Sequence, residues 1–181
     1  HIVANTSTLR IGSAIFVSPL HLPARLAEEI ATLDILSGGR IEVGVVRGAA
    51  SSEYNVAGVP VEESQQRFQE SITMIEGLWT TKNYSFEGKH YKITDANLVP
   101  LPIQKPHPPI HIAATRTKAT QDFVAASGHP LLVGVVLDTE DAMSLCHTMV
   151  NLAKEKGQNM NMGDIPFFRY LYVAETEEEA R

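Results

Sequence analysis

Apolar residues follow two alternating patterns along the chain. Short, almost continuous apolar segments occupy 9–18, 41–46, 110–114, 131–137 and 165–173, and such runs are typical of parallel strands buried on both faces. Between them, apolar residues three and four positions apart predict amphipathic helices over about 23–37, 62–80, 118–127 and 139–156. Strict alternation of strand and helix predicts the α/β class with a parallel sheet.

Prolines and glycines set the expected ends of these helices. Pro23 suits the first helical position, where its missing N–H costs nothing. Gly38, Gly128 and Gly157 follow the last apolar position of three helices and predict left-handed stops. Asp138 or Thr139 is expected to cap the last long helix.

Two segments do not fit the alternation. Residues 48–60 are rich in small side chains and predict a long loop. Residues 83–109 are expected to be an insertion, with a hairpin over 84–93 that turns at Glu87 and Gly88. Five of the ten residues from Pro100 to Pro109 are proline, so this stretch must be extended. We expect one domain over 1–181 that contains this insertion.

Two architectures fit the predicted order. A five-stranded, doubly wound open sheet would be complete at 181 residues, whereas a (β/α)8 TIM barrel needs roughly 250. Thr176 and Glu179 form a capping box that predicts a helix where the chain stops, and position 1 is not Met. We therefore expect a section of a longer chain, with a frayed final turn as the alternative. A section of a longer chain favours the (β/α)8 barrel over the open sheet.

Composition and charge narrow the function. Fifteen Lys and Arg stand against 21 Asp and Glu, giving a net charge of −6, and no basic run exceeds two residues; a nucleic-acid-binding face is not expected. No stretch approaches the ~20 apolar residues of a membrane span. The single Cys146 allows neither an internal disulfide nor a CxxC site, which favours a reducing, cytoplasmic compartment. Prolines around His107 and His111 prevent the helix that would make them a metal pair, so no metal is expected.

Candidate chemistry lies where predicted strands end. The motifs GxGxxG, GxxxxGK[ST], GxSxG and HExxH are absent. Arg47 ends the strand 41–46 and precedes Gly48, a position that points into the ligand crevice of a parallel sheet. Its guanidinium suits a phosphate, with a surface salt bridge as the alternative.

The next strand leads into a second candidate anion site. Thr115, Arg116 and Thr117 open a helix whose free N–H groups attract anions, although either threonine could serve only as an N-cap. Both candidates belong to one rim of the sheet. No paired carboxylates stand out there. We therefore expect the phosphate to be the group by which a cofactor is bound, and not a group that reacts. His21, after the first strand, is a weak pocket candidate with a turn histidine as the alternative.

Longer runs carry a resemblance to a known family. They are 8–14, 19–29 and 33–48, joined by Arg67-Phe68, Leu78-Trp79-Thr80, 86–91 and 106–115. Over about 8–128 the sequence resembles the bacterial luciferase-like flavin-dependent monooxygenases. The resemblance implies a (β/α)8 barrel, of which this chain holds about five central βα units, the third to the seventh strands. It also implies a homodimer that binds FMN at the carboxyl ends of the strands.

The resemblance assigns roles to individual residues. Arg47 and the turn Thr115-Arg116-Thr117 match the family's phosphate ligands. A non-prolyl cis peptide near Ala14 would lie under the flavin ring, and Val46 would face it. The pair Arg47-Gly48 favours FMN over a deazaflavin, which is the alternative cofactor.

The implied activity is that of an oxidoreductase. It would use reduced FMN, supplied by a flavin reductase, and O2 to oxygenate a small organic substrate. A non-catalytic flavin-binding relative and an open-sheet protein that binds a phosphate ligand remain alternatives. No residue present is identified as the catalytic base.

Overall fold

The computed structural model describes residues 1–48, 50–114, 117–169 and 172–180. Its helices, of which η1–η3 are 3-10 turns, are α1 Ile2–Asn5, η1 Ser18–Leu20, α2 Pro23–Ser37, α3 Ser51–Ala57, η2 Val61–Glu63, α4 Ser64–Thr80, α5 Lys118–Ser127, α6 Thr139–Glu155, η3 Met162–Asp164 and α7 Glu177–Ala180. Its strands are β1 Ile11–Gly12, β2 Phe16–Val17, β3 Ile41–Val46, β4 Tyr84–Glu87, β5 Lys92–Ala96, β6 Ile110–Ala113 and β7 Leu131–Leu132. In the described part of the chain, no helix is long and apolar enough to cross a membrane.

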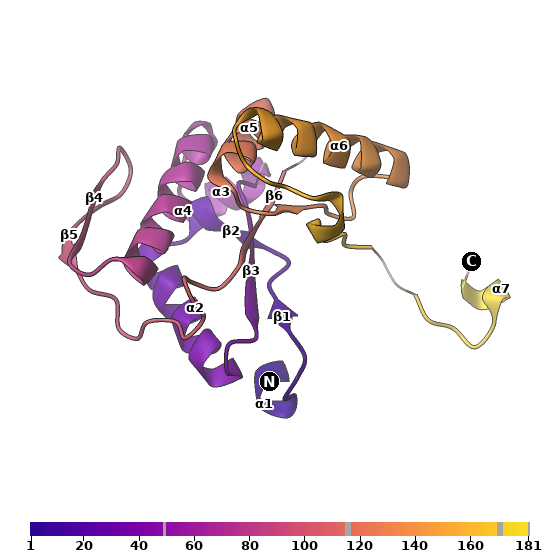
Figure 1. Ribbon diagram of the computed structural model, residues 1–181, viewed down its shortest axis with the longest axis horizontal. Helices are drawn as coiled ribbons and strands as arrows, with labels where there is room; N and C mark the ends of the chain where they lie inside the picture. Colours follow the sequence, from indigo (N-terminus) through magenta and orange to yellow (C-terminus); the bar gives the residue numbers. More distant parts are fainter. Residues whose placement is uncertain (49, 115–116, 170–171, 181) are drawn as a thin grey trace.

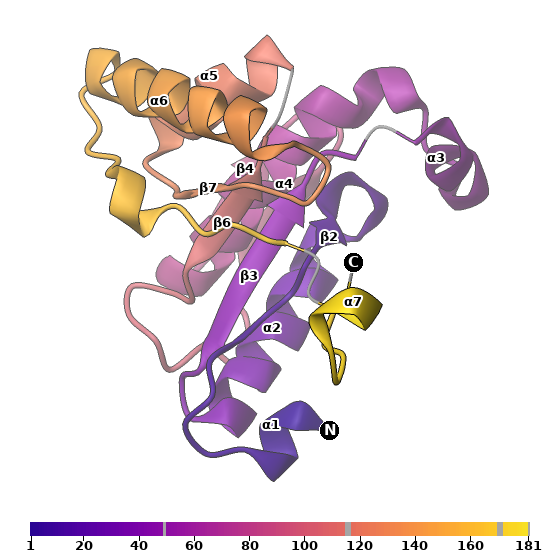
Figure 2. The ribbon, with the colours of Figure 1, turned by 90° about the vertical axis from the view of Figure 1, so that its right-hand side faces the viewer.

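The main sheet is parallel, and its strands lie side by side in chain order. β3 pairs with β1 and β2 on one edge and with β6 on the other, and β7 pairs with β6. Figure 2 shows β3 between β2 and β6, with α2 behind them. Among the strands that the structure describes, this order contains no switch point. The architecture is therefore a curled half of a (β/α)8 barrel, and the alternative of a doubly wound open sheet is wrong.

The core lies between this sheet and its helices. Ile41, Val43 and Val45 of β3 are buried in one cluster with residues of α2 and α4, including Ile30 and Ile75. Because side chains alternate along a strand, Glu42, Gly44 and Val46 belong to the opposite, inner face of the curved sheet. The helices thus cover the outside, as in a barrel wall. α5 and α6 lie together at one end of the sheet, and the hairpin of β4 and β5 lies beside α4 (Figure 1).

Local signals predict the helices well. The helix predicted at Pro23 begins there and ends at Gly38, which has a φ of 69°. Gly128, with a φ of 78°, ends α5 as expected. Asp138 caps α6 by accepting a hydrogen bond from the Asp141 N–H. These three predictions are confirmed because capping depends on neighbouring residues in the sequence.

The strands and one loop differ from the prediction. The run 9–18 forms two short strands, β1 and β2, separated by a cis peptide between Ala14 and Ile15; the non-prolyl cis bond itself is where the resemblance implied it. The run 131–137 pairs only over β7, and 165–173 contributes an isolated bridge between Phe167 and Val133. Residues 48–60, predicted as a loop, contain α3. Strand length depends on partners, which apolar runs alone do not specify.

The hairpin and the proline-rich segment are held by buried carboxylates. Glu70 of α4 accepts hydrogen bonds from the N–H groups of Lys89, His90 and Tyr91 in the hairpin turn, at 2.9, 2.9 and 3.2 Å. Burial opposes ionisation of Glu70, but these donors hold its pKa below the usual value. Asp34 of α2 does the same for the segment after the hairpin.

Replacing Asp34 by alanine is expected to lower the free energy of unfolding by about 3 kcal/mol, because buried donors would lose their acceptor. Asp34 is fully buried and accepts from the N–H groups of Ile103 and Gln104 at 2.8 and 3.0 Å and from Gln104 Nε2 at 2.7 Å. Urea denaturation would measure the loss. The control is Glu29→Ala on the same helix, which removes an exposed ion pair to Arg25 and should cost under about 1 kcal/mol. Equal losses would contradict the role of Asp34.

Candidate functional site

The carboxyl ends of three neighbouring strands form one rim. Val46 of β3 is in register with Val17 of β2 and with Ala113 of β6. The residues that follow these positions therefore emerge at the same edge of the sheet. In barrels this edge carries the functional site.

Arg47 joins the beginnings of two helices at this rim. Its Nη1 donates to Ser64 Oγ, the first residue of α4, at 2.9 Å. Its Nη2 donates to Thr117 Oγ1, at the N-cap of α5, at 3.4 Å. Among the described residues Arg47 forms no ion pair, so the salt-bridge alternative is not realised there. In the described part of the chain, this half-buried guanidinium is therefore held by two neutral hydroxyls.

The backbone around Arg47 is also fixed. The hydroxyl of Tyr54, on α3, donates to the carbonyl oxygen of Arg47. Tyr54 is fully buried, and this burial raises the pKa of its phenol. Gly48 has a φ of 74°, and a Cβ there would come within 2.6 Å of Val17 Cγ1. A positive φ and this close approach both favour glycine at the position that follows Arg47.

The rim can bind an anion. Thr117 stands at the N-cap of α5, but its hydroxyl caps no N–H and instead meets Arg47. The Thr120 N–H of the ten-residue α5 donates to the Thr117 carbonyl oxygen at 3.0 Å, so the two N–H groups before it are the ones left to meet an anion. The helix dipole favours negative charge there. Gln65 of α4 accepts a hydrogen bond from Thr120 of α5, and its buried Nε2 has no partner among the described residues. These donors could hold a phosphate.

The other candidates lie at different depths in the same half-barrel. Thr115 and Arg116 fall outside the described residues. Ala14 is exposed and belongs to the cis peptide between β1 and β2, and Val46 is half-buried at the end of β3. The structure therefore brings Arg47 and Thr117 together.

His21 lies apart from this pair. It is exposed, and its ring meets the edge of Phe16 with a centroid separation of 5.7 Å. None of its contacts among the described residues reaches Arg47. It stays a pocket candidate.

Sequence reasoning missed Ser64 and Tyr54. Ser64 is 17 positions from Arg47, a separation that no local pattern connects. Tyr54 lay in the segment predicted as a loop, although Gly58, now seen with a φ of 67° at the end of α3, is a typical helix stop. Attention to that glycine would have revealed the helix.

The histidines of the proline-rich approach lie elsewhere. His107 Nε2 is 3.3 Å from Glu76 Oε1, and His111 Nε2 is 3.0 Å from Glu42 Oε2. Within the described ranges, no group of three or more His, Cys, Asp or Glu side chains is arranged to hold a metal ion. These pairs therefore belong to the framework of the sheet.

Known proteins have similar sequences. The family model described as "Luciferase-like monooxygenase" matches residues 1–181. The chain is 33% identical over 178 residues to the oxygenase component of flavin-dependent trigonelline monooxygenase from Acinetobacter baylyi, covering 97% of this chain and 49% of the relative. It is 31% identical over 189 residues to the FMNH2-dependent dimethylsulfone monooxygenase of Pseudomonas putida, covering 99% and 49%. The chain spans about half the length of these curated relatives.

Other comparisons bear on the cofactor and on the fold. A further relative, 35% identical over 117 residues, covering 62% of this chain and 34% of the relative, is the F420-dependent glucose-6-phosphate dehydrogenase of Amycolatopsis mediterranei. The crystal structure of monooxygenase RslO1 from Streptomyces bottropensis superposes with a TM-score of 0.89 at 27% identity. The match covers 99% of this chain and 55% of that structure.

Proposed function

Because the chain belongs to the luciferase-like monooxygenase family, we propose that its protein uses reduced FMN and O2 to oxygenate a small organic substrate. The observation that supports this most directly is the cluster of Arg47, Ser64 and Thr117 at the rim. The names of two relatives, one flavin-dependent and one FMNH2-dependent, agree with it.

The residues present fit the phosphate of FMN. Arg47 offers a planar set of N–H donors, and such a guanidinium can bind a phosphate through two parallel bonds. Ser64 and Thr117 add hydroxyls, and α5 adds backbone N–H groups. We assign Thr115 and Arg116 to the same phosphate. Val46 and Ala14 are our candidates for contact with the flavin ring.

In this proposal, the residues of the chain contribute to the reaction by binding and orienting the cofactor. When bound, reduced flavin supplies the electrons that activate O2. Arg47, whose backbone carbonyl accepts a hydrogen bond from Tyr54, would hold the phosphate end of the cofactor. The apolar side chains of Val17 and Val46 beside it would keep water from the reacting face. His21 is proposed as a pocket residue, without a role in proton transfer.

FMN is the preferred cofactor, with the deazaflavin F420 as the alternative. The family includes relatives named for each. We favour FMN because the family resemblance links the Arg47-Gly48 pair to FMN-using members. Comparing the affinity of the full-length protein for FMN and for F420 would separate them.

The proposal extends to partners and compartment. One relative is named as an oxygenase component, and we propose that a separate flavin reductase supplies reduced FMN here as well. We further propose a homodimer in the cytoplasm. The single cysteine agrees with a reducing compartment.

Turnover tests the proposal. The full-length protein with NADH, FMN and a flavin reductase is expected to couple O2 consumption to loss of an organic substrate, with trigonelline and dimethylsulfone as the first probes. The control omits the oxygenase and records uncoupled O2 consumption by the reductase alone. Tight FMN binding without substrate loss across a broad panel would favour a protein that stores flavin. Absence of FMN binding would refute the proposal.

A further inference from the structure

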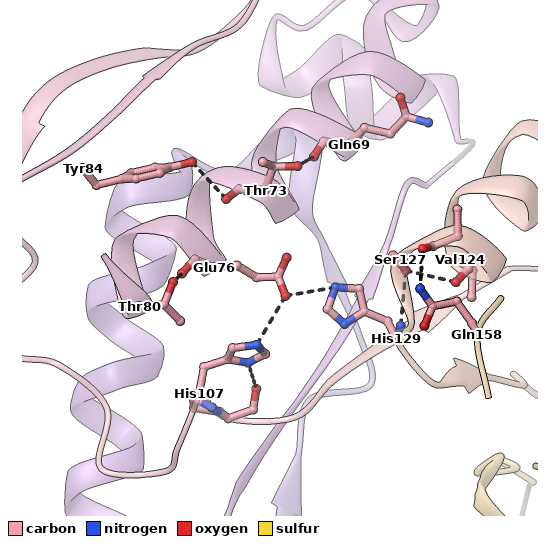
Figure 3. Close-up of polar contacts among 12 residues, drawn as sticks. Gln69, Thr73, Glu76, Thr80, Tyr84, His107, Val124, Ser127, His129 and Gln158 are labelled. Atoms are coloured by element: carbon pink, nitrogen blue, oxygen red, sulfur yellow. Dashed lines mark hydrogen bonds and ion pairs between the residues drawn. The ribbon is translucent and has the colours of Figure 1, made fainter. Parts of the chain in front are cut away.

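A carboxylate shared by two imidazoles lies at the end of the sheet opposite Arg47. Glu76 Oε1, on α4, is 3.3 Å from His107 Nε2 and 3.2 Å from His129 Nε2. His107 precedes β6 and His129 precedes β7, so both belong to segments that lead into the amino ends of strands. Figure 3 shows the two rings converging on the Glu76 carboxylate. One side chain therefore connects three separate elements.

The surroundings of His107 require a proton on each ring nitrogen. Its Nδ1 is 2.8 Å from the carbonyl oxygen of Pro108, which can only accept a hydrogen bond. Its Nε2 faces the Glu76 carboxylate, which when ionised is also only an acceptor. The ring stacks on Trp79, with centroids 5.7 Å apart. An imidazole with acceptors at both nitrogens satisfies both only as the cation.

The electrostatics agree with this geometry. The hydrogen bond to Glu76 raises the pKa of His107, although burial opposes the charge. For Glu76, burial favours the neutral acid, but the hydrogen bonds from His107 and His129 lower its pKa to about 2. The remaining titratable group that faces Glu76 within the described chain is Tyr84 of β4, whose pKa is raised by burial and by the Glu76 charge. Tyr84 therefore stays neutral at any ordinary pH.

Glu76, His107 and His129 hold segments in which several residues are prolines, so the backbone there offers few N–H donors of its own. Proline lacks an N–H, and prolines occupy 106, 108, 109 and 130. The carbonyl of Pro109, two residues after His107, accepts the Val43 N–H of β3 at 2.8 Å. The carbonyl of Pro130, next to His129, accepts the Ile112 N–H of β6 at 3.0 Å. Each histidine thus stands beside the first hydrogen bond of a strand pair.

We propose that Glu76, His107 and His129 form a pH-sensitive lock that fixes the amino ends of β6 and β7 to helix α4. The lock is independent of the proposed flavin chemistry, because it lies at the other end of the strands. Its pH range follows from the two shifts. The pKa of Glu76 is lowered from 4.5, so its contribution is complete above pH 4.5 and is lost as the pH falls toward 2. The pKa of His107 is raised from 6.5, so its contribution is complete below pH 6.5 and is lost as the pH rises through the raised value.

Titration of the His107 ring by NMR, in the full-length protein and in its Glu76→Gln variant, tests the lock. We expect a midpoint above 6.5 in the native protein. In Glu76→Gln the midpoint should fall by roughly one pH unit, because the ring loses its anionic partner while it stays partly buried. A native midpoint at or below 6.5, or a midpoint unchanged in Glu76→Gln, would overturn the proposal.

Amide hydrogen exchange tests what the lock holds. In His107→Gln and His129→Gln at pH 6, protection of the Val43 and Ile112 amides should fall about fivefold. The reference is the Ile11 amide of β1, which donates to the carbonyl oxygen of Arg40, just before β3. In the native protein, protection of the Val43 and Ile112 amides relative to that of the Ile11 amide should also fall as the pH rises through the His107 midpoint. His147→Gln, at an exposed position on α6, is the matched control and should change nothing. Equal ratios in the lock variants and in this control would refute the lock.

Discussion

Replacing Arg47 by alanine is expected to weaken FMN binding by the full-length protein about 10- to 100-fold. The side chain would supply the charged donors to the phosphate, and hydrogen bonds to charged groups contribute about 1.5–3 kcal/mol each. The FMN affinity of Arg47→Lys should lie between those of the native protein and Arg47→Ala, because lysine keeps the charge but loses the planar pair of donors. Flavin titration followed by fluorescence would measure all three affinities.

The control for Arg47 removes the same charge elsewhere. Arg25 of α2 is exposed and pairs with Glu28 and Glu29, so Arg25→Ala should leave FMN affinity unchanged. Thermal unfolding without flavin would show whether loss of the bond to Ser64 disturbs the fold itself. If Arg47→Ala binds FMN within twofold of the native protein, the assigned role of Arg47 is wrong.

The rim that holds Arg47 and Thr117 shows which positions sequence reasoning can bring together. Arg47 and Thr117 were predicted because the end of a parallel strand always points to one edge of the sheet. Their partner Ser64 was not, because a contact across 17 residues depends on how α4 docks on the sheet. The edge at which a residue lies follows from the order of strands and helices. The residues that it contacts depend on how the helices pack on the sheet.

The same division explains the strands and the lock. β3 was predicted with its observed bounds because it lies in the middle of the sheet, with neighbours on both edges. The run 9–18 is divided instead, and between its two strands the Ser13 hydroxyl bonds to the backbone of Gly44. Glu76 looks in the sequence like one more polar position on an amphipathic helix. Only the fold brings His107 and His129 to it from segments beyond the hairpin.

Replacing Gly44 by alanine is expected to have the largest effect on stability, lowering the free energy of unfolding by about 3 kcal/mol or more. A Cβ at this position would lie 2.1 Å from the carbonyl oxygen of Ser13. That atom belongs to backbone, and Ser13 is held there because its hydroxyl contacts both the N–H and the carbonyl of Gly44 at 3.0 Å. Relief of the clash would therefore have to separate β1 and β2 from β3.

Gly12→Ala is the matched control for this substitution. Gly12 lies on the neighbouring strand, and the nearest atoms to an added Cβ are 3.7 Å away, an ordinary contact. It should change the free energy of unfolding by less than about 1 kcal/mol, since alanine also restricts the unfolded chain. Urea denaturation of both full-length variants would measure the difference.

Because Val46 and Arg47 continue the strand that contains Gly44, any folded Gly44→Ala protein should also bind FMN more weakly. Equal stability of the two variants would mean that Ser13 can move aside, and the expected clash at Gly44 would be wrong.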